Sequence, residues 1–159
     1  MKKVPALELL VAGDGAERGP LERRAPQLGL SGRFGFLGWV DPEAVSGLLN
    51  RVTLVLVPSR QEAFGQAALE AATVGRPVVA SAVGGLPEIA RHRETGLLLH
   101  SRSKRARADE IGRPLECLNA VADMGQGTQA DARTRFDWAA TMDETEALDV
   151  RMVKAFAEE

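Results

Sequence analysis

Short apolar runs alternate with stretches that have apolar residues at helical spacing over the first hundred residues. The runs predict β-strands, because each is too short for a helix and is bounded by glycine or proline. The run at residues 53–57 lacks polar alternation, which is typical of a strand covered on both faces of a parallel sheet. The predicted strands span residues 7–12, 33–37, 53–57, 77–80 and 96–99.

Helices are predicted between these strands. Asp41 is a favourable N-cap residue, and Pro42 suits the first helical position. Strands alternating with helices of this length indicate βα units. The sequence therefore predicts the α/β class, a Rossmann-like doubly wound parallel sheet with C-terminal helices. The predicted helices span residues 16–28, 42–50, 66–74 and 87–91.

The pattern changes after residue 100. Residues 102–107 are rich in arginine and lysine but contain no aromatic residue. We expect a solvated loop there, rather than a contact with nucleic acid or acidic lipid. Two amphipathic helices are predicted at residues 105–123 and 137–157, separated by a Gly-Gln-Gly turn at residues 125–127.

Length and composition indicate one soluble domain. The chain has 159 residues, of which 45% are hydrophobic and 26% are charged, as in an ordinary globular protein with a single core. We expect residues 1–100 to form the core of this domain and residues 101–159 to form a helical extension of it. The formal charge of −2 gives no overall attraction for nucleic acid.

Cysteine usage and the apolar runs predict the compartment. Cys117 is the single cysteine, which excludes an internal disulfide and fits a reducing environment; we expect its thiol to pack in the core. The apolar run at residues 9–12 is too short for a signal peptide, and no run reaches the length of a membrane span. A cytoplasmic protein without a transmembrane segment is expected.

The segment of residues 59–70 follows a predicted central strand and opens a helix. Ligands of open parallel sheets bind at this edge, where helix N-termini point into a crevice. The backbone N–H groups of Gly65, Gln66 and Ala67 are predicted to form an anion site suited to a diphosphate. Gly65 would let the ligand approach the backbone closely.

Two carboxylates flank this predicted anion site. Glu62 lies in the loop, where it would accept hydrogen bonds from sugar hydroxyls. Glu70 lies one turn into the helix among small apolar neighbours, and vicinal ribose hydroxyls would supply the donors that it needs. Acidic residues near a helix N-terminus also arise from capping and the helix dipole alone, so the pair by itself is not specific.

The wider combination of motifs is specific. It resembles the C-terminal, donor-binding domain of GT-B-fold retaining glycosyltransferases of the group 1 type, densely over residues 7–100 and thinly afterwards. The matching segments are Gly13-Asp14-Gly15, Phe36-Leu37-Gly38-Trp39-Val40, Pro58-Ser59, Glu62-Ala63-Phe64-Gly65, Leu69-Glu70-Ala71, Gly75-Arg76-Pro77-Val78-Val79-Ala80, Gly84-Gly85-Leu86-Pro87-Glu88-Ile89, Gly96-Leu97-Leu98 and Arg135-Phe136-Asp137-Trp138.

The resemblance implies a hexosyltransferase-type enzyme and a role for each matched residue of the loop. Glu62 would be the residue of the catalytic site that binds hydroxyls of the transferred sugar. The backbone at Phe64 and Gly65 would hold the sugar and the diphosphate, and Gln66 and Ala67 would add amides to the phosphates.

The resemblance also implies the rest of the donor site. Glu70 would hold the ribose, Val40 would pack beside the nucleobase, and Gly13 and Gly15 would shape the opposite wall of the pocket. The donor would be a UDP-, GDP- or ADP-sugar. Neither a metal, nor another cofactor, nor a protein nucleophile is expected.

The chain departs from the family pattern at its start. Such domains usually begin with one further strand, followed by an arginine and a lysine that neutralise the diphosphate, whereas here Lys2 and Lys3 directly precede the first matched strand. The N-terminal acceptor-binding domain and its catalytic histidine are also expected to be missing, and His92 and His100 are predicted to be surface residues. The expected partners are a nucleotide sugar and an acceptor-binding domain or separate chain. A peripheral membrane contact through that missing domain is also left open.

Two alternatives remain beside the transferase. One is a nucleotide-sugar-binding module without transfer activity, and the other is a sugar-nucleotide epimerase of GT-B fold. A dinucleotide-binding enzyme is disfavoured, because Gly13 and Gly15 are not followed by the third glycine of the G-x-G-x-x-G fingerprint.

Overall fold

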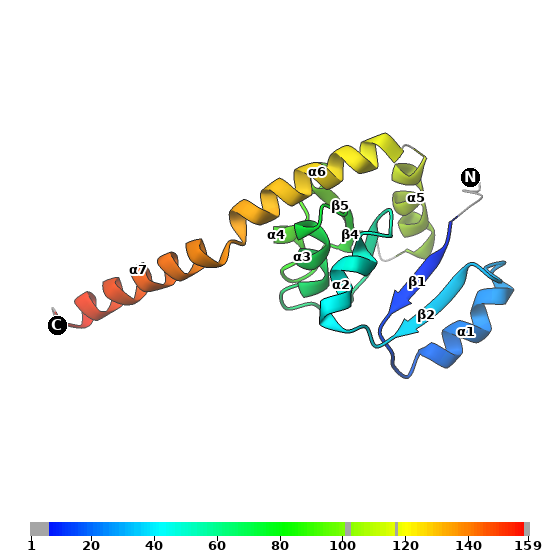
Figure 1. Cartoon of the computed structure of the whole chain (residues 1–159), viewed down its shortest axis with the longest axis horizontal. Helices are drawn as coiled ribbons and strands as arrows, with labels where there is room; N and C mark the ends of the chain where they lie inside the picture. Colours follow the sequence, from blue (N-terminus) through cyan, green and yellow to red (C-terminus); the bar gives the residue numbers. More distant parts are fainter. Residues whose placement is uncertain (1–6, 101–102, 117, 158–159) are drawn as a thin grey trace. The chain divides into compact units, whose positions relative to one another are not determined.

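The computed structural model describes residues 7–100, 103–116 and 118–157 (Figure 1). Contacts divide the chain into two compact units, Met1–Arg51 and Val52–Glu159. The earlier expectations for Lys2, Lys3 and Cys117 fall outside the described residues. Within the described ranges, no helix is both long and apolar enough to span a membrane.

Over residues 7–51, the described part of the first unit contains two parallel strands and two helices. β1 (Leu9–Ala12) pairs with β2 (Phe34–Gly38), and the connection between them contains α1 (Arg18–Gln27). α2 (Pro42–Leu49) begins as the sequence predicts, since the Asp41 side chain accepts a hydrogen bond of 2.9 Å from the Glu43 amide.

The second unit contains a three-stranded parallel sheet in the order β3-β4-β5. All four residues of the central strand β4 are buried, which explains why its sequence shows no polar alternation. Small apolar residues of α3 and the side chains of α4 complete the core. The elements are β3 (Val55–Val57), α3 (Gln66–Thr73), β4 (Val78–Ser81), α4 (Leu86–Ile89) and β5 (Gly96–Leu99). The predicted α/β class with parallel strands is confirmed.

Three further helices follow β5: α5 (Lys104–Leu115), α6 (Leu118–Arg135) and α7 (Trp138–Ala157). α6 packs on α3, and its Gln129 side-chain amide donates a hydrogen bond of 3.1 Å to the Thr73 carbonyl. Residues 138–156 of α7 are exposed, including Trp138 and Phe156. The predicted C-terminal helices are thereby confirmed.

The turn predicted at residues 125–127 is wrong, because these residues lie inside α6. The physical reason is packing. A Cβ atom on Gly125 would lie 2.4 Å from the Gly75 carbonyl oxygen and 3.1 Å from Cδ of Pro77. The glycine therefore lets α6 approach the backbone that follows α3, a contact that local sequence does not reveal.

The solvated loop predicted at residues 102–107 is also wrong from residue 104 onward, where α5 begins. Arginine and alanine are strong helix formers, so the basic residues belong to the first turns of a helix. The helix predicted at residues 105–123 is divided in two, since α5 ends at Leu115 and α6 begins at Leu118.

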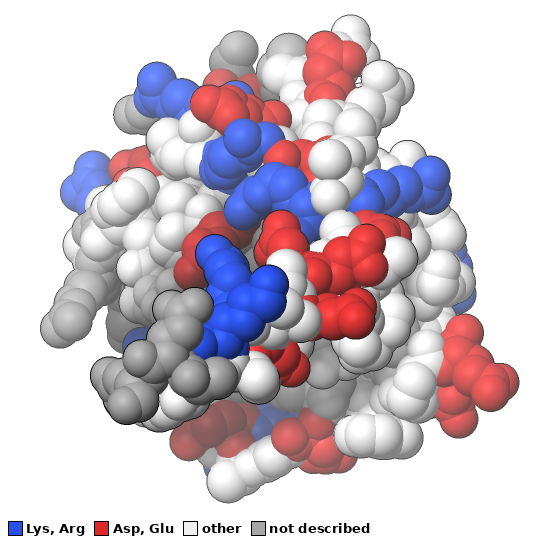
Figure 2. Space-filling model, turned by 90° about the vertical axis from the view of Figure 1, so that its left-hand side faces the viewer, with Lys and Arg blue, Asp and Glu red and all other residues white. Residues whose placement is uncertain are grey.

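Charges of both signs are mixed on the surface. On the face drawn in Figure 2, lysine and arginine lie beside aspartate and glutamate rather than in a patch of one sign. Ion pairs contribute to this mixing: Asp131 pairs with both Arg91 and Arg135, and Arg18 pairs with Asp14 and Glu22.

Candidate functional site

The junction between β3 and α3 forms a helix N-terminus that is accessible to a ligand. Gly65 is the N-cap residue and has a left-handed backbone, with φ of +104°. The first amides that donate to its carbonyl are those of Ala68 and Leu69, at 2.9 and 3.0 Å. The N–H groups of Gln66 and Ala67 therefore lie in the first turn, where a helix does not satisfy its own donors, and both residues are exposed.

Gly65 is required by the packing of the fold. A Cβ atom there would lie 2.7 Å from Cδ2 of Leu86 and 3.1 Å from Cδ1 of Ile89, and the positive φ is itself unfavourable for other residues. The sequence predicts close approach of a ligand to this glycine. The structure supplies a separate reason for it, and the ligand role stays a prediction.

The loop before α3 rests on a glycine turn after β4. Gly85 donates a backbone hydrogen bond of 3.2 Å to the Ala63 carbonyl. A Cβ atom on Gly84 would lie 1.6 Å from the Glu62 carbonyl oxygen, and one on Gly85 would lie 2.6 Å from that of Phe64. These two glycines thus fix the path of the candidate donor loop, a role that the sequence analysis did not assign to them. Two adjacent glycines in the matched motif were the sequence feature that could have indicated this role.

Glu62 is half-buried and already oriented by a neighbour. The Ser59 hydroxyl donates a hydrogen bond of 3.3 Å to Oε2 of Glu62. Because a carboxylate accepts about four hydrogen bonds, this contact leaves capacity for hydroxyl groups of a ligand. The contact of Glu62 with a sugar stays a prediction.

Glu70 is also half-buried. The Gln66 side-chain amide donates a hydrogen bond of 3.1 Å to Oε1 of Glu70, one turn along α3. From the sequence, only the backbone of Gln66 was predicted to act, although residues four apart on a helix face the same side. Gln66 therefore contributes two features to the candidate site, a first-turn amide and an orienting contact for the carboxylate.

Phe64 lies in the same loop with 50% of its surface exposed. Its ring contacts the ring of Phe136 edge to face, with the centroids 6.3 Å apart. Phe136 follows α6 and was not among the predicted site residues. The structure brings it to the donor loop from a distant part of the chain.

The remaining predicted site residues belong to the first unit, where they follow its two strands. The Gly13 amide donates a hydrogen bond of 2.7 Å to the Gly38 carbonyl, and Val40, half-buried, lies just beyond β2. The Gly15 amide donates one of 2.8 Å to the Asp14 carboxylate. This hydrogen bond, with that from Arg18, holds the pKa of Asp14 below its ordinary value. Gly13, Gly15 and Val40 thus gather at the carboxyl edge of the β1–β2 sheet.

The two histidines lie outside this constellation. His92 and His100 are both exposed, as predicted, and their rings meet edge to face with centroids 5.7 Å apart. Nδ1 of His92 accepts a hydrogen bond of 3.1 Å from the Leu98 amide. In the part of the chain that the structure describes, no group of three or more His, Cys, Asp or Glu side chains could hold a metal ion.

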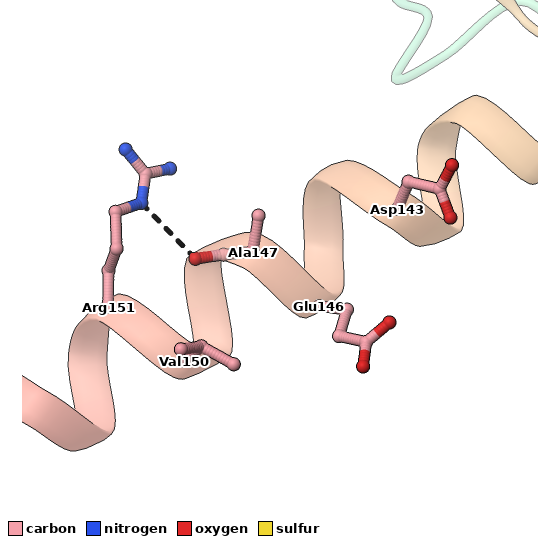
Figure 3. A pocket seen from close by; sticks show the side chains of 5 residues that line it. All are labelled: Asp143, Glu146, Ala147, Val150 and Arg151. Atoms are coloured by element: carbon pink, nitrogen blue, oxygen red, sulfur yellow. Dashed lines mark hydrogen bonds between the residues drawn. The ribbon is translucent and has the colours of Figure 1, made fainter.

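A shallow hollow on the surface of α7 is separate from the candidate site. Figure 3 shows that the side chains lining it project from successive turns of this single helix, where Nε of Arg151 donates to the Ala147 carbonyl. A surface formed by one helix cannot enclose a nucleotide. The lining residues are Asp143, Glu146, Ala147, Val150 and Arg151.

Comparisons with known proteins point to one family. The family model for glycosyl transferases group 1 matches residues 1–131. The D-inositol 3-phosphate glycosyltransferase of Corynebacterium glutamicum (strain R) is 37% identical over 130 residues, which cover 82% of this chain and 31% of that relative. This chain therefore spans about a third of the relative's length.

Solved structures give the same picture. The sucrose-phosphate synthase of Thermosynechococcus elongatus superposes with a TM-score of 0.81 and 31% identity, covering 96% of this chain and 40% of that one. The Anabaena protein Alr3699/HepE, solved in complex with UDP-glucose, superposes with a TM-score of 0.80 and 28% identity, covering 93% of this chain and 42% of that one.

Proposed function

This chain belongs to the glycosyl transferases group 1 family, and we propose that it is the donor-binding domain of a retaining glycosyltransferase. Its fold is that of the GT-B enzymes. The proposed reaction transfers a sugar from a nucleotide-diphosphate sugar to an acceptor. The observation that most supports it is the exposed N-terminus of α3, flanked by the half-buried carboxylates Glu62 and Glu70.

The helix N-terminus suits the diphosphate. The amides of Gln66 and Ala67 precede the first internal hydrogen bonds of α3, and the helix dipole favours negative charge at this end. The loop leading to it is fixed by the Gly84–Gly85 turn. Donors held in place before the ligand arrives need little reorganisation, so they stabilise developing charge effectively.

The two carboxylates suit the two sugars of the donor. Glu62, oriented by Ser59, would accept hydrogen bonds from hydroxyls of the transferred sugar. Glu70, oriented by Gln66, would accept hydrogen bonds from the vicinal ribose hydroxyls. Both assignments follow from the matched motif. The structurally similar Anabaena protein was solved in complex with UDP-glucose, which supports a nucleotide-diphosphate sugar as the donor.

In the proposed transfer, the bond between the sugar C1 and the diphosphate oxygen breaks, and a bond from the acceptor oxygen to C1 forms. The electron pair of the broken bond stays on the diphosphate, and the acceptor proton ends on a phosphate oxygen of that leaving group. Attack on the face from which the diphosphate departs retains the configuration at C1. The amides at the start of α3 would stabilise the charge on the leaving group, with no metal or other cofactor.

The acceptor is proposed to bind elsewhere, on an acceptor-binding domain or a separate chain. The first relative described above is about three times as long as the matched region. A cytoplasmic location accords with the proposed use of nucleotide sugars.

Calorimetric titration of the full chain tests the donor site. We expect one of UDP, GDP or ADP, and its sugar conjugate, to bind with a dissociation constant well below millimolar. Glu70→Ala should weaken the nucleotide and the nucleotide sugar alike, by roughly 10- to 100-fold, because hydrogen bonds to a charged group contribute about 1.5–3 kcal/mol. Glu62→Ala should weaken only the nucleotide sugar.

Glu144→Ala is the matched control, since Glu144 is an exposed glutamate on α7, and binding should be unchanged. Absence of binding for every nucleotide would refute the donor site. Unchanged binding in Glu70→Ala would refute the ribose assignment alone. Transfer activity is then measured after addition of a separately produced acceptor-binding domain, and binding without transfer would favour the non-catalytic module.

A further inference from the structure

Phe136 lies between α6 and α7 and is half-buried. Its ring meets that of Phe64 at 81°, with the centroids 6.3 Å apart, which is a favourable edge-to-face geometry. Phe64 belongs to the loop between β3 and α3 that contains Glu62. The contact therefore joins the end of α6 to the candidate donor loop within one compact unit.

Phe136 is itself held by the last turn of α6. Its amide donates a hydrogen bond of 3.0 Å to the Ala132 carbonyl, and the Arg135 guanidinium lies 5.1 Å from the centroid of its ring. Nη1 of Arg135 donates a hydrogen bond of 2.7 Å to the Glu88 carbonyl in α4. The same nitrogen lies 3.0 Å from the Asp131 carboxylate, which also pairs with Arg91.

Asp131 connects the two arginines by ion pairs. Its side chain is only 10% exposed, so both arginines are held by a carboxylate that is itself mostly withdrawn from water. The end of α6 is consequently connected to Glu88 in α4 and to Arg91, two residues beyond α4. Phe136 therefore contacts Phe64 from a helix end that is itself held by a hydrogen bond and ion pairs.

Two supports thus act on the donor loop. The Gly84–Gly85 turn supports the backbone from Glu62 to Phe64, and Phe136 supports the Phe64 side chain. Half of the Phe64 surface is exposed, and the Phe136 ring contacts this side chain, so loss of that ring would remove one restraint on the loop. A loop that must be ordered on binding lowers affinity.

We infer that Phe136 is a positioning residue of the donor site, which acts through Phe64 to hold the loop in its binding conformation. This inference rests on the proposed function. Both ligands carry the diphosphate and the ribose, but only the nucleotide sugar carries the transferred sugar that would meet Glu62 in the loop. Loss of the Phe136 ring should therefore affect the nucleotide sugar more than the free nucleotide.

The test is calorimetric titration of Phe136→Ala with the nucleotide sugar and with the free nucleotide that bind the unaltered chain. We expect the nucleotide sugar to bind roughly 2- to 10-fold more weakly, as for the loss of one aromatic pair, and the free nucleotide to change less. Phe136→Tyr, which keeps the ring, should restore binding. Phe156→Ala is the control, because Phe156 is 73% exposed on α7.

A double-mutant cycle separates positioning from a general loss of stability. If Phe136 acts through Phe64, the effect of Phe136→Ala should vanish in a Phe64→Ala background. Thermal unfolding of each variant reports whether it is folded, and Phe136→Leu replaces Phe136→Ala if the latter is not. Equal effects of Phe136→Ala in both backgrounds, or equal losses for both ligands, would overturn the positioning role and leave the proposed function intact. If the unaltered chain binds no nucleotide sugar, the proposed function fails and this inference fails with it.

Discussion

Replacing the two glycines of α6 by alanine should change stability in opposite directions. Gly125 and Gly127 both lie inside this helix. A Cβ atom on Gly125 would lie 2.4 Å from the Gly75 carbonyl oxygen, closer than any real Cβ contact, whereas one on Gly127 would lie 3.5 Å from the Glu94 carbonyl oxygen, an ordinary contact. The local sequence is nearly the same for both residues, so the contrast isolates the packing of α6.

The expected magnitudes follow from two competing terms. Glycine to alanine inside a helix stabilises by about 1 kcal/mol when the methyl group meets no obstacle. Gly127→Ala should realise most of this gain. Gly125→Ala must displace backbone at Gly75 and Cδ of Pro77, and forced overpacking costs about 1–3 kcal/mol. The net effect of Gly125→Ala should be a loss of up to about 2 kcal/mol.

Thermal unfolding followed by circular dichroism measures both changes. In a chain of 159 residues, 1 kcal/mol shifts Tm by about 2–4 °C, so the two variants should differ by several degrees in opposite directions from the unaltered chain. Gly112→Ala in α5 is the control, because a Cβ atom there would meet nothing within 4 Å. Stabilisation by Gly125→Ala equal to that by Gly127→Ala would refute the close approach of α6 to Gly75.

Two other predictions concern the site and its pH dependence. Gly84→Ala should abolish nucleotide-sugar binding in calorimetry, because its Cβ atom would lie 1.6 Å from the Glu62 carbonyl oxygen and would displace the donor loop; retained affinity would contradict the support assigned to the glycine turn. Asp14→Asn should reduce stability at neutral pH, because the pKa of Asp14 is lowered below 3.8 by the Gly15 amide and Arg18. A carboxylate with a lowered pKa stabilises the fold when the pH is above its ordinary, unfolded-state pKa. This stabilisation is lost as the pH falls through the folded-state pKa. Chemical denaturation from neutral to acidic pH should thus show the variant and the unaltered chain converging, and a constant difference would contradict this account.

Local rules account for much of the fold. Val78, Val79 and Ala80 of β4 form an apolar run and are buried, and Asp41 caps α2 through its own side chain. The start of α3 could also be predicted from local sequence, because Gly65 is followed directly by helix-forming residues. Parallel pairing of the strands was predicted from the alternation of strands and helices along the sequence.

The residues of the candidate site come from the sequence, whereas the contacts that support them come from the structure. The motif around Glu62 and Glu70 identified both carboxylates, and the spacing of Gln66 and Glu70 on one helix face would have predicted their hydrogen bond. The contact of Phe64 with Phe136 could not be predicted, since nothing near either residue in the sequence indicates the other. The carbonyl oxygens that crowd Gly84 and Gly85 likewise come from a separate loop.

Periodicity and turn residues were sufficient for the α/β class and for placing Glu62, Gly65 and Glu70 at the end of a strand and the start of a helix. Such features depend on residues that are adjacent in the chain. The position of Gly125 within α6 depends instead on the Gly75 carbonyl oxygen. Local sequence does not show whether a glycine lies in a turn or in a closely packed helix. The difference depends on whether an atom of another element approaches its Cα. The packing of α3, α6 and the donor loop was therefore determined by contacts that only the folded chain brings together.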